Sequence, residues 1–138
     1  MISDLKKAGF TGDKIVLAAH SLGGVMSQKY AAENPNLVKA QVLMGSVLQR
    51  SLREILPDGT SHFKYEVPTL TLGGTKDGLM RITRVTESFW HSFENITPSQ
   101  KDLFPVVALE GVNHMGFMSG SPPGLVKKRD LVADVSEA

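Results

Sequence analysis

Cysteine is absent from the 138-residue chain. Its absence excludes disulfide bonds, thiolate metal sites and a cysteine nucleophile, so any covalent chemistry must come from another side chain. Four histidines are spread along the chain without the close spacing of metal ligands. Neither a G-x-G-x-x-G pattern nor a phosphate-loop lysine pattern is present. We therefore expect no metal and no cofactor.

An excess of one charge is also absent. The 15 basic and 14 acidic residues leave a net charge of +1, which predicts neither nucleic acid nor an anionic membrane surface as a partner. No apolar run approaches the ~18 residues of a membrane span. The polar N-terminus lacks the apolar region of a secretory signal, so a cytoplasmic protein is the default. Because a targeting segment would be lost with a truncated N-terminus, the compartment stays unassigned, as does the oligomeric state.

What is present is an alternation of apolar runs with segments of helical spacing. The expected strands are residues 15–19, 38–44, 69–72 and 105–109, and the expected helices are residues 3–8, 23–33, 48–56, 79–93 and 125–135. The first run is continuously apolar, which is typical of a strand buried on both faces. This order predicts an α/β fold, a parallel sheet with crossover helices, in one domain over residues 1–138.

Three of these strands are followed by a polar residue that can take part in catalysis. Ser21 follows the first strand, Asp77 the third and His114 the fourth. Each alone has an ordinary explanation, because a serine at a strand end is often a helix cap, an aspartate in K-D-G a turn residue and a loop histidine a solvated one. The carboxyl ends of parallel strands meet at one edge of the sheet, where functional groups gather. Together the three residues therefore predict one site.

The stretches "AHSLGG", "GGTKDGL" and "GVNHMGF" resemble the α/β-hydrolase family, in which serine, acid and histidine follow in this order. The resemblance implies Ser21 as nucleophile, His114 as general base and Asp77 as the acid that orients it. The family's nucleophile elbow usually reads G-x-S-x-G, and here Ala19 replaces the first glycine.

The physical chemistry of these residue types agrees with those roles. A serine hydroxyl is a weak nucleophile until a neighbouring base takes its proton, and a carboxylate fixes the tautomer of the imidazole base. A helix that starts just after Ser21 directs free N–H groups at a developing oxyanion, with the N–H of Leu22 as one donor. Gly23 and Gly24 are expected to keep the approach of helix and strand free of side chains.

Apolar residues near His114 suggest where a substrate binds. We expect His20, Met115 and Phe117 to line a substrate pocket, and we also expect His20 to support the nucleophile beside it. Phe89, Trp90 and Phe93 could also line a pocket, although core packing at i, i+4 spacing is the more common role for such a pair. The two remaining histidines, His62 and His91, are expected at the surface.

The resemblance covers only the second half of the family's fold, because the chain begins just before the nucleophile strand. We expect a partial domain that lacks the N-terminal strands, or a naturally minimal form, and the source of a second oxyanion donor stays open. The predicted function is that of a serine hydrolase acting on a small carboxylic ester, which could be lipid-like. A non-catalytic binding protein, an inactive fragment and an acyltransferase with the same triad are the alternatives.

Overall fold

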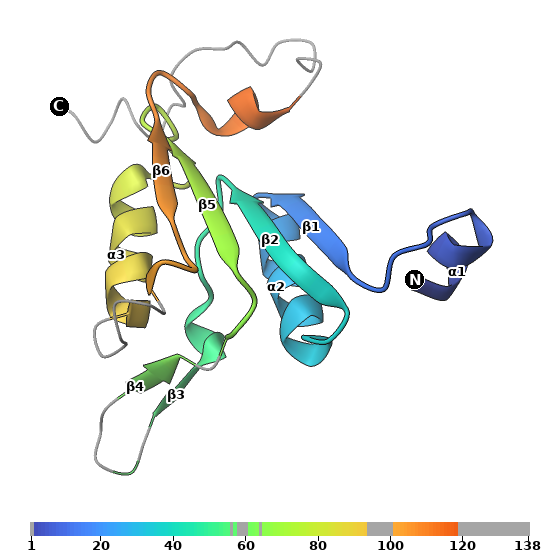
Figure 1. Cartoon of the computed structure of the whole chain (residues 1–138). Coiled ribbons are helices and arrows are strands. Elements are labelled where there is room, and N and C mark those ends of the chain that lie inside the picture. The colour runs from blue at the N-terminus through green and yellow to red at the C-terminus, as the bar shows by residue number, and fades with distance from the viewer. Residues whose placement is uncertain (1, 56, 58–60, 64, 94–100, 119–138) are drawn as a thin grey trace, which may run out of the picture.

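The structure, a computed structural model, describes residues 2–55, 57, 61–63, 65–93 and 101–118. Within them lies a four-stranded sheet in the order β1-β2-β5-β6, with all neighbours parallel (Figure 1). Its strands are β1 (Ile15–His20), β2 (Val38–Met44), β5 (Thr69–Gly74) and β6 (Val106–Leu109). The α/β fold class and the parallel sheet are therefore confirmed, and the carboxyl ends of all these strands meet at one edge.

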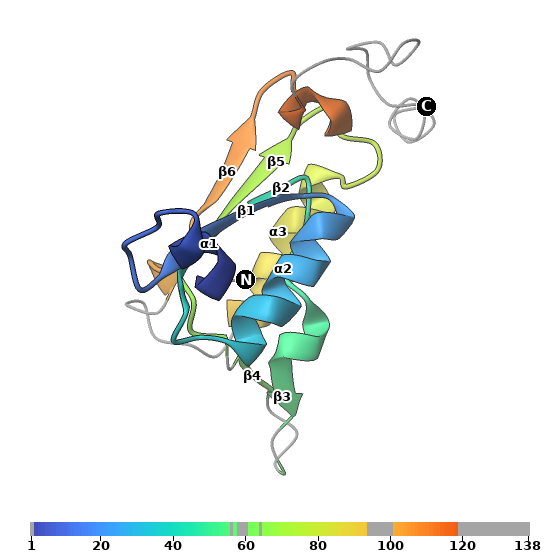
Figure 2. The ribbon, with the colours of Figure 1, turned by 90° about the vertical axis from the view of Figure 1, so that its right-hand side faces the viewer.

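Two helices cover one face of this sheet. Figure 2 shows α2 (Leu22–Glu33) and α3 (Ile82–Phe93) side by side on the same face, while the short α1 (Ile2–Lys7) precedes β1 and buries no residue. Between sheet and helices lies the apolar core. Its fully buried members include Leu43 of β2, Ala31 of α2 and Phe93 of α3.

The other face of the sheet is open in the part of the chain that the structure describes. Val16 of β1 is 59% exposed and Val107 of β6 is 41% exposed. The prediction that the first strand is buried on both faces is therefore wrong for the described residues, because α2 and α3 both pack on one face. The continuous apolar run alone does not say which faces are covered.

The connection from β2 to β5 differs from the predicted helix over residues 48–56. It contains a 3₁₀ turn, η1 (Arg50–Leu52), and two short antiparallel strands, β3 (Arg53–Ile55) and β4 (Ser61–Phe63). These strands lie on either side of the sequence Pro57-Asp58-Gly59-Thr60, a strong turn signal. A turn that reverses the chain lets the flanking residues pair backbone to backbone, which a helix at this place would prevent.

The remaining predicted elements agree with the structure to within a few residues. The helix predicted at 79–93 begins at Ile82, and the strand predicted at 69–72 continues to Gly74. Gly9, which follows α1, has a φ of 96°, the left-handed conformation that glycine adopts at helix ends. The helix predicted at 125–135 lies outside the described residues.

Two buried glutamines connect the elements around β2. Gln28 of α2 donates from Nε2 to the carbonyl oxygens of Gly24 and Val47, and its Oε1 accepts the backbone N–H of Gln49. Gln41 of β2, which is 1% exposed, accepts at Oε1 a 2.6 Å hydrogen bond from the hydroxyl of Tyr65. A buried amide is tolerated when its hydrogen bonds are made, so these contacts hold residues 47–49 against α2 and Tyr65 against β2.

Burial raises the pKa of Tyr65 to about 12, against an ordinary value of 10, with an opposing effect from a hydrogen bond to Thr69. The folded state then keeps its proton at a pH where the unfolded state loses it. The contribution of the neutral phenol to stability is therefore complete below pH 10 and is lost as pH rises from about 10 to about 12.

We predict that the difference in unfolding free energy between the wild type and Tyr65→Phe shrinks by about 1 kcal/mol between roughly pH 9 and 11. Urea denaturation at a series of pH values measures this difference, and the subtraction removes the titration of other groups. A difference that stays constant over this range would contradict the burial of an un-ionised Tyr65.

The two glycines near the start of α2, Gly23 and Gly24, differ in what surrounds them. A Cβ at Gly24 would lie 2.7 Å from the Cβ of Ser46 and 3.3 Å from Cδ2 of Leu43, so α2 can approach β2 this closely only without a side chain. A Cβ at Gly23 would meet only the Cβ of Ala19, at an ordinary 3.8 Å. The expectation that a glycine is required for the close approach of helix and strand is confirmed for Gly24. It is wrong for Gly23, where a side-chain methyl group has room beside Ala19.

Gly24→Ala is predicted to lower the free energy of unfolding by about 1–3 kcal/mol, the usual cost of overpacking. Gly23→Ala is the matched control, one position away on the same helix turn, and is expected to leave stability unchanged or slightly raised. Chemical denaturation of both variants measures the contrast. Equal stability of the two would show that the contact with Ser46 does not restrict the helix.

Candidate active site

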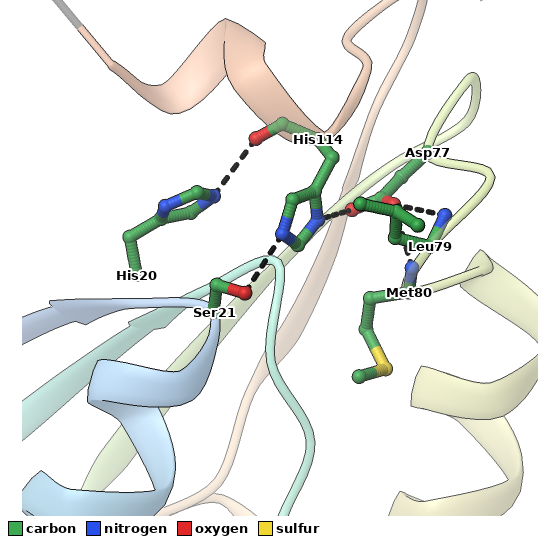
Figure 3. Close-up of polar contacts among 6 residues, drawn as sticks. All are labelled: His20, Ser21, Asp77, Leu79, Met80 and His114. Atoms are coloured by element: carbon green, nitrogen blue, oxygen red, sulfur yellow. Dashed lines mark hydrogen bonds and ion pairs between the residues drawn. The ribbon is translucent and has the colours of Figure 1, made fainter. Parts of the chain in front are cut away.

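The three residues predicted to form one site lie at the carboxyl edge of the sheet. Ser21 directly follows β1, Asp77 follows β5 by three residues, and His114 begins η2 (His114–Phe117), the turn after β6. Figure 3 shows their side chains directed toward one another, with His114 between the other two. Residues 93 positions apart in the sequence are thus brought into contact.

The hydrogen bonds assign a role to each ring nitrogen of His114. Its Nδ1 lies 2.8 Å from Oδ2 of Asp77, and its Nε2 lies 2.8 Å from Oγ of Ser21. Because a carboxylate only accepts hydrogen bonds, Nδ1 carries the hydrogen. In the neutral ring Nε2 is then an acceptor, and the Ser21 hydroxyl donates to it. This arrangement lets the imidazole take the hydroxyl proton.

Asp77 is a buried carboxylate whose oxygens are both hydrogen-bonded. Its side chain is inaccessible to solvent. Oδ2 accepts the bond from His114, and Oδ1 accepts the backbone N–H groups of Leu79 at 3.0 Å and Met80 at 2.6 Å (Figure 3). Buried charge is tolerated only with such partners, and together they hold the carboxylate in one orientation.

Ser21 occupies a strained turn between β1 and α2. Its φ of 53° and ψ of −126° make it the one non-glycine residue with positive φ among those described. Such a conformation costs of order 1–3 kcal/mol and persists where surrounding contacts impose it. Here the Ser21 N–H donates to the carbonyl of Met44, and the Ser21 carbonyl accepts from the N–H of Gly24. The turn leaves Leu22, whose N–H is the predicted oxyanion donor, as the first residue of α2, where N–H groups lack partners within the helix.

Gly45 and Gly74 border the site, and sequence reasoning gave neither a role in it. Gly45 has a φ of 52°, and a Cβ there would lie 3.1 Å from Nδ1 of His114 and 3.2 Å from Oδ2 of Asp77. At Gly74 a Cβ would lie 2.8 Å from the carbonyl carbon of Val112, so the glycine lets the loop that carries His114 lie against the end of β5. The available signal was glycine after a predicted strand: Gly45 directly follows residues 38–44, and Gly74 is the second of two glycines after residues 69–72.

Further hydrogen bonds join the two loops that carry Asp77 and His114. The hydroxyl of Thr75 accepts the N–H of Gly111 at 2.9 Å, and the N–H of Lys76 donates to the carbonyl of Val112 at 3.0 Å. Both contacts lie within three residues of the acid or the histidine. The separation of Asp77 and His114 is therefore fixed by backbone contacts as well as by their own hydrogen bond.

The predicted pocket residues lie beside His114. The Nε2 of His20 is 2.8 Å from the carbonyl oxygen of His114, and its ring centroid is 5.9 Å from that of Phe117. Met115 and Phe117 are half-buried on η2. A cavity of about 550 Å³ lies instead between residues 47–51 and residues 80–88, which contribute Met80 before α3 and Arg84, Glu87 and Ser88 on it. The pocket assignment stays a prediction.

The other candidate side chains lie elsewhere. Phe93 is 1% exposed in the core with Phe89 packed against it, as expected for core residues, whereas Trp90 is 66% exposed. His91 is exposed on α3 as predicted, and the side chain of His62 lies outside the described residues. In the part of the chain that the structure describes, no cluster of metal-binding side chains occurs and no helix is long and apolar enough to cross a membrane.

Gly45→Ala is predicted to destabilise the fold and to disturb the Asp77–His114 hydrogen bond, because the added methyl group meets both partners. Gly9→Ala is the matched control. It places alanine at a similarly positive φ of 96° with nothing within 4 Å. Both variants are expected to lose about 1–2 kcal/mol from backbone strain, and only Gly45→Ala should lose the low-field NMR signal of the His114 Nδ1 proton. Retention of that signal in Gly45→Ala would contradict the predicted contact.

Comparison with known proteins gives the site a family context. Among curated proteins, none matches the chain by sequence. Of solved structures, a protein from Thermoplasma acidophilum described as a predicted CIB-like hydrolase is 19% identical with a TM-score of 0.56, over 98% of this chain and 54% of its own. Est1E from Butyrivibrio proteoclasticus is 16% identical with a TM-score of 0.54, over 85% of this chain and 60% of its own. An esterase domain from Rhodothermus marinus is 20% identical with a TM-score of 0.51, over 75% of this chain and 52% of its own.

At these identities the likeness concerns the fold, and the chain spans 52–60% of the length of these three neighbours. The model of the alpha/beta hydrolase family matches residues 3–124, which include Ser21, Asp77 and His114. The chain therefore belongs to the alpha/beta hydrolase family.

Proposed function

We propose that the chain is a serine hydrolase that cleaves a carboxylic ester through an acyl-enzyme on Ser21, with His114 as general base and Asp77 as the orienting acid. The observation that carries the proposal is the continuous hydrogen-bonded series from Ser21 Oγ through His114 to Asp77, with both links at 2.8 Å. Hydrolase chemistry agrees with the family and with the descriptions of the solved structures that the fold resembles.

The first half of the reaction forms the acyl-enzyme. Oγ of Ser21 attacks the ester carbonyl carbon while Nε2 of His114 takes the hydroxyl proton, and Asp77 stabilises the resulting imidazolium. The carbonyl oxygen becomes an oxyanion, to which the N–H of Leu22 donates. When the tetrahedral intermediate collapses, the bond to the alcohol oxygen breaks and His114 returns the proton to that oxygen. The alcohol leaves, and the acyl group stays on Ser21.

The second half restores the enzyme. A water molecule attacks the acyl carbon, and Nε2 of His114 takes one of its protons. Collapse of the second tetrahedral intermediate breaks the bond to Oγ, and His114 returns that proton to Ser21. The carboxylic acid is released. Both halves need Nε2 of His114 to stay next to Oγ of Ser21. The hydrogen bonds that fix Asp77 also fix the ring of His114, and they therefore support the proposal.

Ester as the substrate class is supported by two considerations. An alcohol is a good enough leaving group for a single imidazole to assist, and the neighbour from Rhodothermus marinus is described as an esterase domain. Half-buried Met115 and Phe117 next to His114 and the exposed Leu22 beside Ser21 favour an apolar acyl group. Acyl transfer to an alcohol in place of water would use the same residues.

A fluorophosphonate probe tests the proposal, because it reacts covalently with an activated serine. We predict that mass spectrometry locates the label on Ser21 and that both Ser21→Ala and His114→Ala abolish it. Asp77→Asn should slow labelling by roughly 10³–10⁴-fold, since the wrong histidine tautomer is then favoured. Ser3→Ala, at an exposed serine of α1, is the control and should label normally.

Absence of label on the folded wild-type chain would contradict the proposal and favour a non-catalytic member of the family. Label on Ser21 that persists in His114→Ala would contradict the role of His114 as base. Circular dichroism of each variant shows whether the fold is kept.

A further inference from the structure

His20 makes a contact that the proposed reaction does not yet use. It is the last residue of β1, half-buried, and its Nε2 lies 2.8 Å from the carbonyl oxygen of His114. A carbonyl oxygen only accepts, so Nε2 of His20 carries the hydrogen and donates it. The bond goes to the backbone of His114, whereas Asp77 and Ser21 bond to its ring.

The ring of His20 also packs against the site. Its centroid lies 4.7 Å from that of the His114 ring, with the planes inclined by 44°. Its centroid also lies 5.9 Å from that of the Phe117 ring. Figure 3 shows His20 beside His114 and not between His114 and Ser21, so it leaves the proton path open. The arrangement supports His114 without competing for its hydrogen bonds.

The position of His114 depends on the loop after β6, which must run over the carboxyl ends of the strands to reach Ser21 after β1. In the strand order β1-β2-β5-β6, the nucleophile follows one edge strand and His114 follows the other. With neighbouring strands ~4.8 Å apart, these edges are about 14 Å from each other. The loop after β6 is fixed to the loop after β5 by Thr75 and Lys76, and η2 lies above the strand ends (Figure 1). On the β1 side, the bond from His20 anchors the same turn.

We propose that His20 is a positioning residue: its Nε2–H bond to the His114 carbonyl anchors η2 to the end of β1 and thereby sets the distance between His114 Nε2 and Ser21 Oγ. The inference rests on the proposed function, which it extends by one residue. It differs from the pocket role predicted from sequence, because a pocket residue acts on substrate binding whereas a positioning residue acts on the chemical step.

Two substitutions separate the hydrogen bond from the bulk of the side chain. His20→Leu replaces the imidazole by an apolar side chain of comparable size and so removes the donor. His20→Gln keeps a donor, since its amide Nε2 can reach where the imidazole Nε2 lies. With p-nitrophenyl acetate as the ester, we predict that His20→Leu lowers kcat by roughly 10–100-fold with KM within about 2-fold, as expected when a catalytic group is misplaced. His20→Gln should retain kcat within about 3-fold.

NMR provides a readout that does not require turnover. In the wild type, long-range ¹H–¹⁵N spectra should show His20 as the Nε2–H tautomer. The low-field Nδ1 proton of His114 should be present in the wild type and in His20→Gln, and broadened or lost in His20→Leu. Thermal unfolding of both variants confirms that they fold.

The outcomes distinguish the possible failures. Unchanged kcat and an unchanged His114 signal in His20→Leu would overturn the positioning role. A raised KM with kcat kept would assign His20 to the substrate pocket, and equal loss in both variants would assign the effect to the ring and not to the donor. If the wild type neither turns over nor labels, the proposed function fails, and the NMR comparison still decides whether His20 positions His114.

Discussion

The hydrogen bond between Asp77 and His114 is the interaction on which the rest of the site depends. Asp77 is inaccessible to solvent, so its charge is stable only while His114 and the N–H groups of Leu79 and Met80 are in place. The same bond fixes the histidine tautomer and turns Nε2 toward Ser21. Two loops that follow different strands must therefore keep their separation, and the backbone contacts of Thr75 and Lys76 do this.

Close approach of main chains makes this geometry possible. Gly24 lets α2 pack on β2, Gly74 admits the loop that carries His114, and Gly45 leaves room for the Asp77–His114 pair. At each position a methyl group would meet a neighbour that has little freedom to move. The strain at Ser21, which alone among the described non-glycine residues has positive φ, is held by the same packing. The site is thus formed by backbone shape as much as by the side chains of Ser21, Asp77 and His114.

Sequence reasoning predicted the sheet and the grouping of Ser21, Asp77 and His114, because both depend on local signals: apolar runs of strand length followed by polar turns. It missed the β3–β4 hairpin, since three-residue strands that pair through the backbone carry almost no pattern. It also predicted β1 to be buried on both faces, which depends on where distant helices pack. Gly45 lies against His114, which is 69 positions away in the sequence, and His20 bonds to His114 from 94 positions away. Only the folded chain brings these residues together.

Family membership and the arrangement of Ser21, His114 and Asp77 lead to one central claim: that Ser21 carries an acyl group during turnover. The most direct measurement is to mix the chain with p-nitrophenyl acetate, stop the reaction with acid after a short interval, and map acetylated peptides by mass spectrometry. The account predicts acetyl on Ser21 in the wild type and none there in His114→Ala. An acetyl group found only on lysine side chains, or on Ser21 to the same extent in both proteins, would contradict it.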